Sequence, residues 1–288
     1  MPELPEVHAL AVDLSQRLAA RRVDRLEMVS FTALKTFDPP VSVLSGAVVD
    51  VVVRHGKYLD VSMTTPDGAE LHLVVHLARA GWVRWRQSSP KSARPGKGPL
   101  AARLVLEDGS GVDFTEAGTK KSLALWLVHD VGELPQVAGL GPDPLDDGVT
   151  AEVLGRILQE SGRGQIKGVL RSQSVIAGIG NAYSDEILHA AGLSPYQAAD
   201  RTDADQLLEA IQSTLGAAIA RSEGTAAADL KAEKKAGLRV HGRAGEPCPV
   251  CGDLIREVVF ADRSMQYCPT CQTGGKILAD RGLSRLLK

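Results

Sequence analysis

The chain begins with a helical pattern of apolar residues and continues with a β pattern. Between residues 6 and 21 the apolar positions that share one helix face are Val7, Leu10, Ala11, Leu14 and Leu18. From about residue 23 to 128, short runs rich in valine, leucine and aromatic residues are separated by turn residues. The clearest runs lie at 48–53, 58–63, 70–76, 81–85, 103–106 and 123–128. Short strands at regular spacing predict a β-sandwich behind an N-terminal helix.

The second half of the chain returns to helical periods. Residues 132–149 are rich in proline, glycine and aspartate and are predicted to be a linker. Helices are predicted at 151–160, 166–171, 182–191 and 204–222, before a cysteine-bearing module. The resulting prediction is an α+β multidomain chain, divided into 1–131, a linker at 132–149, 150–240 and 241–288.

Charge is distributed unevenly along the 288 residues. The formal net charge of −2 argues against nucleic-acid binding, but residues 79–103 carry seven arginines and lysines and no acidic residue. Residues 234–288 carry ten basic and five acidic residues. Such stretches can contact phosphates, although a solvated loop explains the first equally well. No apolar run is long enough to span a membrane, and the acidic start is unlike a signal peptide, so we expect a cytoplasmic protein.

All four cysteines lie within 24 residues, as two C-x-x-C pairs sixteen residues apart: Cys248, Cys251, Cys268 and Cys271. This spacing predicts a tetrahedral site in which four thiolates bind one structural Zn²⁺. Disulfides are disfavoured in a cytoplasmic protein. The segment between the pairs should form a hairpin with Arg263 at its tip, where an arginine is also common on a plain surface.

Two further segments have both a structural and a chemical interpretation. Once Met1 is removed, Pro2 has a free secondary amine that can form an iminium with an aldehydic carbon, and Glu3 could transfer protons. The same residues also make an ordinary helix start. Farther along, a Gly-rich turn at 177–180 precedes Asn181, whose predicted role is the N-cap of a helix, and its backbone N–H groups could bind a phosphate.

Taken together, these motifs resemble the formamidopyrimidine-DNA glycosylase / endonuclease VIII family over nearly the whole chain. The matching segments are Pro2-Glu3-Leu4-Pro5-Glu6-Val7, Gly56-Lys57-Tyr58-Leu59, Val75-His76-Leu77 with Gly81, Gly178-Ile179-Gly180-Asn181-Ala182-Tyr183, and His241-Gly242-Arg243 before the first cysteine. The resemblance implies an N-terminal β-sandwich, a helix-two-turn-helix domain and a zinc finger, with damaged double-stranded DNA bound between the domains by a monomer.

The resemblance also implies site roles. Pro2 attacks C1′ of a flipped sugar, Glu3 acts on the ring oxygen, Lys57 assists β-elimination and Arg263 assists δ-elimination. The residues implied to contact DNA are Glu6, His76, Arg79, Lys167 and Asn181. The implied activity is that of a bifunctional DNA glycosylase and abasic-site lyase of base excision repair. A damaged-DNA-binding protein without turnover is the alternative, followed by a zinc-ribbon interaction protein.

Three departures from the family pattern bear on the lesion. Family members usually carry a bulky apolar side chain, the wedge, in the loop that follows the His-Leu motif. Here this first wedge loop reads Ala78-Arg79-Ala80, so Arg79 would have to replace the apolar wedge. The second, at 115–121, lacks its arginine and phenylalanine, and the loop at 226–238 is short and lacks an aromatic residue. We therefore expect 8-oxoguanine to be a poor substrate. Abasic sites, oxidised pyrimidines, ring-opened or hydantoin lesions and bulky adducts are the expected alternatives. The basic tail 274–288 could contact DNA or a partner, or be solvated.

Overall fold

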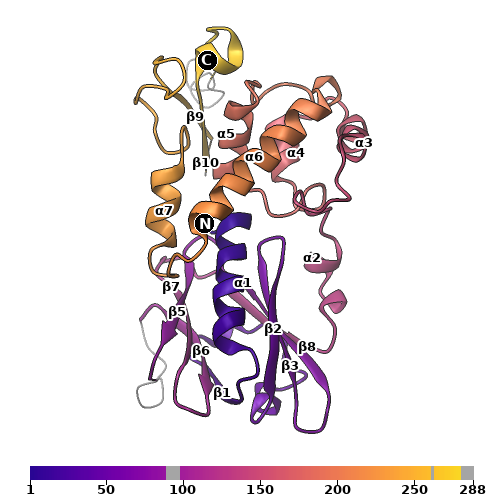
Figure 1. Ribbon diagram of the computed structural model, residues 1–288, viewed down its shortest axis with the longest axis vertical. Helices are drawn as coiled ribbons and strands as arrows, with labels where there is room; N and C mark the ends of the chain where they lie inside the picture. The colour runs from indigo at the N-terminus through magenta and orange to yellow at the C-terminus, as the bar shows by residue number, and fades with distance from the viewer. Residues whose placement is uncertain (89–97, 261–262, 280–288) are drawn as a thin grey trace. The chain divides into compact units, whose positions relative to one another are not determined.

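The computed structural model describes residues 1–88, 98–260 and 263–279, with the backbone alone at 263. They form two compact units, one of Met1–Gly139 with Arg221–Ala232, the other of Leu140–Ala220 with Glu233–Lys288 (Figure 1). These bounds differ from the predicted ones, because 221–232 packs with the N-terminal unit and the predicted linker contains α2 (Pro135–Ala138). The predicted basic residues that lie outside the described ones are Lys91, Arg94, Lys97, Arg281, Arg285 and Lys288.

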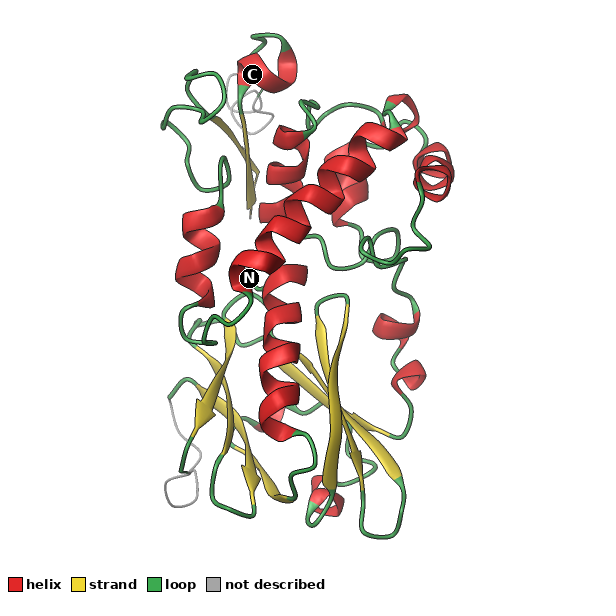
Figure 2. Cartoon of the chain, viewed as in Figure 1, coloured by secondary structure: helices red, strands yellow, loops and turns green. Residues whose placement is uncertain are grey.

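The first unit contains the predicted β-sandwich (Figure 2). One antiparallel sheet has the order β2 (Val48–His55), β3 (Tyr58–Thr64), β4 (Glu70–His76), β8 (Ala124–Val128). The other has the order β1 (Val23–Met28), β6 (Leu100–Leu106), β7 (Gly111–Glu116), β5 (Gly81–Arg86). The prediction did not single out β7 as a strand. All six of its residues are buried, including the charged Asp113 and Glu116, so buried positions do not alternate with exposed ones along it. Asp113 is stabilised there by buried Arg103, whose Nε lies 2.6 Å from its carboxylate.

The helix α1 (Leu4–Leu18) packs its predicted apolar face into the sandwich core with β2 and β3. It runs antiparallel to β2. Ser15 Oγ accepts a hydrogen bond from Val52 N at 3.2 Å, and just after the helix Ala20 N donates to Val49 O at 2.8 Å. The N-terminal end of α1 therefore lies toward the end of β2 that leads into β3.

The second unit is helical and carries the cysteine module. Its elements are α3 (Ala151–Ser161), α4 (Ile166–Arg171), α5 (Asn181–Ala190), most of α6 (Ala204–Ser222), most of α7 (Leu230–Gly237), β9 (Arg256–Phe260), β10 (Arg263–Tyr267) and α8 (Pro269–Thr273). α7 was not predicted and occupies the short loop before the cysteine module. No helix among the described residues is long and apolar enough to cross a membrane.

Candidate active site

The N-terminal residues predicted to be catalytic lie immediately before the first turn of α1. Glu3 is the N-cap residue, and its backbone N–H donates to Glu6 Oε2 at 2.8 Å, as in a capping box. Pro2 is buried, and the exposed fractions of Glu3 and Glu6 are only 2% and 1%. The capping interpretation of this segment is thus confirmed. Glu6 has a structural role at the helix start, and its contact with DNA stays a prediction.

Lys57 lies at the same end of the first unit as Pro2. From the contact between Ser15 and Val52, α1 leads back over eleven residues to Leu4, a rise of about 16 Å, and Glu3 and Pro2 precede it. From Val52, β2 continues for three residues to His55, about 10 Å along the strand, and Gly56 and Lys57 form the turn that leads into β3. Because α1 and β2 are antiparallel, the start of α1 and this turn lie at the same end of the unit (Figure 1). The fold therefore brings two residues 55 positions apart to one end of the sandwich.

His76 completes this end of the sheet. It is paired with Tyr58 across β4 and β3, and the two ring centroids lie 4.7 Å apart. Burial, and then the nearby positive charge of Lys57, lower the pKa of His76 from 6.5 to about 4. Burial also raises the pKa of Tyr58. His76 is therefore neutral at physiological pH and can give or accept a hydrogen bond without adding charge beside Lys57.

The two predicted wedge loops differ in how they are held. Arg79 is exposed and follows Ala78, whose φ of 51° lies in the left-handed region that non-glycine residues seldom adopt. In the second loop the buried carboxylate of Glu116 accepts hydrogen bonds from Ser122 N and Leu123 N at 2.9–3.2 Å. The loop is thus held from inside by an acidic side chain. The replacement of the apolar wedge by Arg79 stays a prediction.

In the second unit, Asn181 contacts the strand that begins at Arg263. α5 begins at Asn181 itself and its N-cap is Gly180, so the predicted N-cap role of Asn181 was wrong by one residue. The side-chain amide instead donates from Nδ2 to Ser264 O at 2.7 Å. Asn181 therefore fixes the start of β10 against the Gly-rich turn. The side chain of Arg263 lies outside the described part of the chain.

Lys167 is buried in an ion pair. Its Nζ lies 2.6 Å from Asp185 Oδ1 and 2.8 Å from Ser184 Oγ. The other carboxylate oxygen of Asp185 is 2.7 Å from His241 Nδ1 and accepts from Gln266 N at 3.2 Å. Asp185 is fully buried, so the carboxylate compensates the lysine charge inside the unit. A phosphate contact by Lys167 stays a prediction.

Sequence reasoning missed the carboxylates of α5. Beside Asp185, Glu186 accepts hydrogen bonds from the backbone N–H groups of Arg239, Val240 and His241 at 2.8–2.9 Å. Two adjacent acidic residues in an otherwise buried helix were the available signal, because carboxylates are almost never buried without partners. They join α5 to the segment that leads into the cysteine module.

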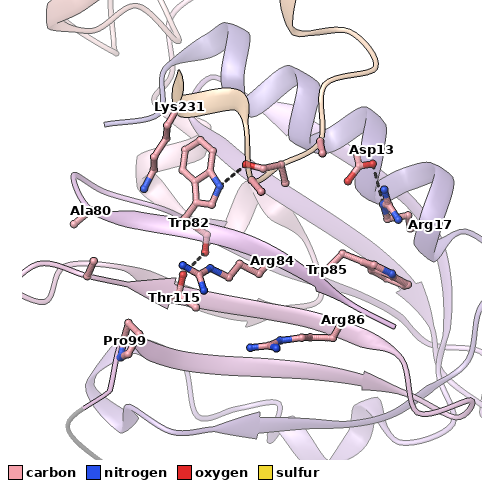
Figure 3. A pocket seen from close by; sticks show the side chains of 14 residues that line it. Asp13, Arg17, Ala80, Trp82, Arg84, Trp85, Arg86, Pro99, Thr115 and Lys231 are labelled. Carbon is pink, nitrogen blue, oxygen red and sulfur yellow. Dashed lines mark hydrogen bonds and ion pairs between the residues drawn. The ribbon is translucent and has the colours of Figure 1, made fainter. Parts of the chain in front are cut away.

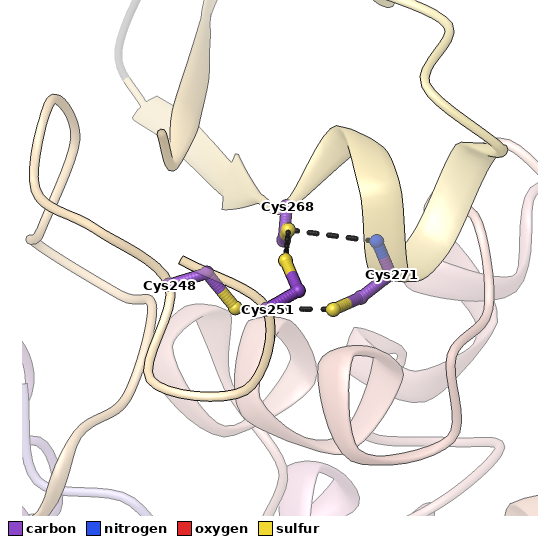
Figure 4. Close-up of side chains that lie close together, drawn as sticks. All are labelled: Cys248, Cys251, Cys268 and Cys271. Atoms are coloured by element: carbon purple, nitrogen blue, oxygen red, sulfur yellow. Dashed lines mark hydrogen bonds between the residues drawn. The ribbon is translucent and has the colours of Figure 1, made fainter. Parts of the chain in front are cut away.

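The four cysteines meet the requirements of a zinc site. Their Sγ atoms all lie within 4.8 Å of one another, with Cys248–Cys271 at 3.8 Å and Cys251–Cys268 at 3.4 Å (Figure 4). A tetrahedron with Zn–S bonds of about 2.3 Å has edges of about 3.8 Å. The four cysteines are free thiols. They form the predicted structural Zn²⁺ site, in which four protein ligands leave no open position.

His189 on α5 contacts this site. Its Nε2 lies 3.2 Å from Cys248 Sγ, and its Nδ1 is buried without a hydrogen-bond partner among the described residues. Burial, and then Arg239, lower the pKa of His189 to about 4, so the ring is neutral. A zinc-bound thiolate can only accept, so the tautomer that fits the zinc site carries its proton on Nε2 and donates to Cys248 Sγ. Such outer-shell donors orient metal ligands.

Comparison with known proteins agrees with this architecture. Residues 1–119 match the formamidopyrimidine-DNA glycosylase N-terminal domain, 140–229 its H2TH domain, and 245–274 the zinc finger found in FPG and IleRS. A formamidopyrimidine-DNA glycosylase of Symbiobacterium thermophilum is 34% identical, covering 94% of this chain and 89% of that protein. An uncharacterized formamidopyrimidine-DNA glycosylase-like protein of Mycobacterium tuberculosis is 59% identical over 157 residues, 54% of this chain and 98% of that protein.

Solved structures give the same answer for the fold. MutM in complex with DNA containing carbocyclic 8-oxo-G superposes with a TM-score of 0.81 at 25% identity, covering 94% of this chain and 100% of that one. A complex between the Lactococcus lactis Fpg and an abasic-site DNA also gives 0.81, at 24% identity, covering 94% and 99%. The three domain matches follow one another along nearly the whole chain. The chain therefore belongs to the formamidopyrimidine-DNA glycosylase / endonuclease VIII family.

Proposed function

We propose that this protein is a bifunctional DNA glycosylase and abasic-site lyase of base excision repair, with Pro2 as the nucleophile. The observation that carries the proposal is the position of Pro2 and Glu3 at the end of the sandwich that also holds Lys57 and His76. Met1, about half exposed, is the residue whose removal would free the Pro2 amine. We also propose that the protein acts as a monomer on DNA in the bacterial cytoplasm.

The reaction proposed for these residues consists of substitution and elimination steps and needs no oxidant or reductant. Pro2 N forms a bond to C1′ while the bond from C1′ to the damaged base breaks, and the base leaves with a proton. Glu3 protonates the ring oxygen as the sugar opens, which gives an iminium at C1′. The iminium acidifies the 2′ proton, and loss of that proton expels the 3′ phosphate. The cation of Lys57 would stabilise the leaving phosphate, and Arg263 would assist δ-elimination on the other side.

The lesion preference is proposed from the loops rather than from the sugar chemistry. Arg79 stands where an apolar wedge is expected, and the second wedge loop is held by Glu116. The segment before the zinc finger forms α7 instead of a long covering loop. We propose that these features disfavour 8-oxoguanine opposite cytosine. Slow or absent excision of 8-oxoguanine beside rapid processing of an abasic-site duplex would agree with this, and brisk excision would refute it.

Borohydride trapping of the untagged protein on an abasic-site duplex tests the mechanism. We expect a covalent protein–DNA adduct that is lost in Pro2→Gly, with Pro5→Gly as the control that keeps the amine and changes a neighbouring proline. Strand cleavage without a trapped adduct would exclude an iminium at Pro2. Tight, salt-dependent binding of the abasic duplex with neither adduct nor cleavage would instead favour the alternative, a damaged-DNA-binding protein without turnover.

A further inference from the structure

A hollow of about 570 Å³ lies on the first unit, and its lining includes none of the residues assigned to catalysis (Figure 3). One end is lined by Asp13 and Arg17 of α1. Asp13 is nine helical residues beyond Leu4, a distance of about 14 Å along the helix axis, and Pro2 lies before Leu4. The hollow therefore extends well beyond the reach of the N-terminal amine, and the proposed reaction does not use it.

The wall of the hollow comes from β5 and the segment 226–231. Trp82, Arg84 and Arg86 alternate along β5 and all line the hollow. The indole of Trp82 is held in place because its Nε1 donates to Ala227 O at 2.6 Å. Lys231 lies over this indole, with Nζ 4.5 Å from the ring centroid. The wall is thus fixed by contacts between segments 145 residues apart in the sequence.

The cations of the hollow exceed its anions. Arg17 is paired with Asp13 at 2.8 Å, and Arg86 is paired with Asp113 at 2.8 Å. Arg84 and Lys231 have no ion-pair partner within the described ranges. Their positive charges repel each other. Burial and then the charge of Arg84 lower the pKa of Lys231. An anion placed between these two groups would remove the repulsion.

The size and the walls of the hollow select among anions. A volume of about 570 Å³ is far larger than one phosphate needs, and is in the range of sites for nucleotide-sized ligands. Trp85, half-buried at the Arg17 end, also lines the hollow, and the guanidinium groups of Arg17 and Arg21 lie 5.3 and 5.7 Å from its ring centroid. A duplex could contact only the rim of such a hollow, whereas an unpaired strand can enter it. The phosphates of an unpaired strand therefore fit the charge and the size of the hollow.

We propose that this hollow is a second nucleic-acid site, in which Arg84 and Lys231 bind the phosphates of an unpaired strand. Phosphate chemistry of the same kind could come from a free polyphosphate, so both sources are included in the test. The site uses none of the residues assigned above to the sugar chemistry and requires no lesion, although Ala80, Ala117 and the segment 226–228 of the loops assigned to lesion preference also line it.

Intrinsic fluorescence provides the readout, since two of the three tryptophans line the hollow. The full chain is titrated with an undamaged single-stranded oligonucleotide of roughly 12 nucleotides, and separately with tripolyphosphate. We expect a saturable change whose dissociation constant rises at least about tenfold in Arg84→Ala/Lys231→Ala. The salt dependence should also weaken, with the log–log slope falling by about 1.4 for two lost phosphate contacts. If the oligonucleotide saturates the signal at a lower concentration than tripolyphosphate does, the result supports an unpaired strand as the ligand. If tripolyphosphate saturates it at the lower concentration, the unpaired strand is refuted as the ligand.

The matched control is Arg22→Ala/Arg25→Ala, which removes two exposed arginines of the same unit that do not line the hollow. It changes the net charge equally and should keep the affinity within about twofold. An equal loss in both double variants would show a general charge effect and overturn the proposal. So would a wild-type chain whose fluorescence does not respond to either probe. Loss of borohydride trapping, in contrast, would affect only the glycosylase proposal.

Discussion

The neutral His76 beside Lys57 predicts a loss of stability in mild acid that belongs to one side chain. The pKa of His76 is about 4 in the folded protein and 6.5 when the histidine is unperturbed. Between these values the unfolded chain binds a proton that the folded chain does not. The stabilisation is therefore complete above pH 6.5 and is lost as the pH falls toward 4. At pH 5 the loss is about 2 kcal/mol, since each pK unit corresponds to about 1.4 kcal/mol.

The assay is urea unfolding at pH 7.5 and pH 5, followed by tryptophan fluorescence. Trp82, Trp85 and Trp126 all lie in the first unit, so the signal reports the unit that contains His76. His76→Gln removes the titrating group. The free energy of unfolding of the wild type should fall between the two pH values by about 2 kcal/mol more than that of the variant.

The control is His129→Gln, which removes an exposed histidine of the same unit and should leave the wild-type pH dependence unchanged. A wild-type and His76→Gln difference below about 0.5 kcal/mol would refute the reasoning. It would mean that the imidazole is charged in the folded protein, so that neither burial nor Lys57 keeps the proton away. An equal effect of both substitutions would assign the pH dependence to histidines in general.

Two further predictions concern the second unit. Asp185→Asn leaves the buried Lys167 charge without its partner and should lower the free energy of unfolding by about 3–5 kcal/mol, measured by hydrogen exchange of α5 amides. Lys167→Met/Asp185→Leu should recover much of this loss, and an additive result would show that the two groups do not interact. His189→Phe removes the donor to Cys248 and should weaken zinc binding about 10–100-fold in chelator competition. Unchanged zinc affinity would show that the contact does not orient the thiolate.

The features that the sequence predicts well are those whose signal is local. The apolar face of α1 and most strands follow from spacing within ten to fifteen residues, and the zinc ligands follow from two C-x-x-C pairs. β7 was not singled out because its charged Asp113 is buried through Arg103, a contact that alternation alone does not reveal. α7 was missed for a related reason. It has few apolar residues, and its Leu230 packs into the core of the first unit.

The candidate site shows the same division. Motifs indicate Pro2 and Lys57 by residue type, but only the antiparallel packing of α1 on β2 shows that they share one end of the sandwich. The contacts of Asp185 and His189 join residues from 18 to 81 positions apart, so no local pattern contains them. Long-range polar contacts of this kind depend on which segments the fold brings together.

α5 connects the zinc site to the strand that begins at Arg263. Asn181, Asp185 and His189 follow one another at intervals of four residues, and so lie along one helix face. Each contacts a different part of the zinc module: Ser264 O, Gln266 N and Cys248 Sγ. Strand β10, which begins at Arg263, is thereby held against α5 at Ser264 and Gln266. Zinc closes the module at one end of this row and Asn181 fixes the other, so a loosened zinc site should displace the backbone that carries Arg263.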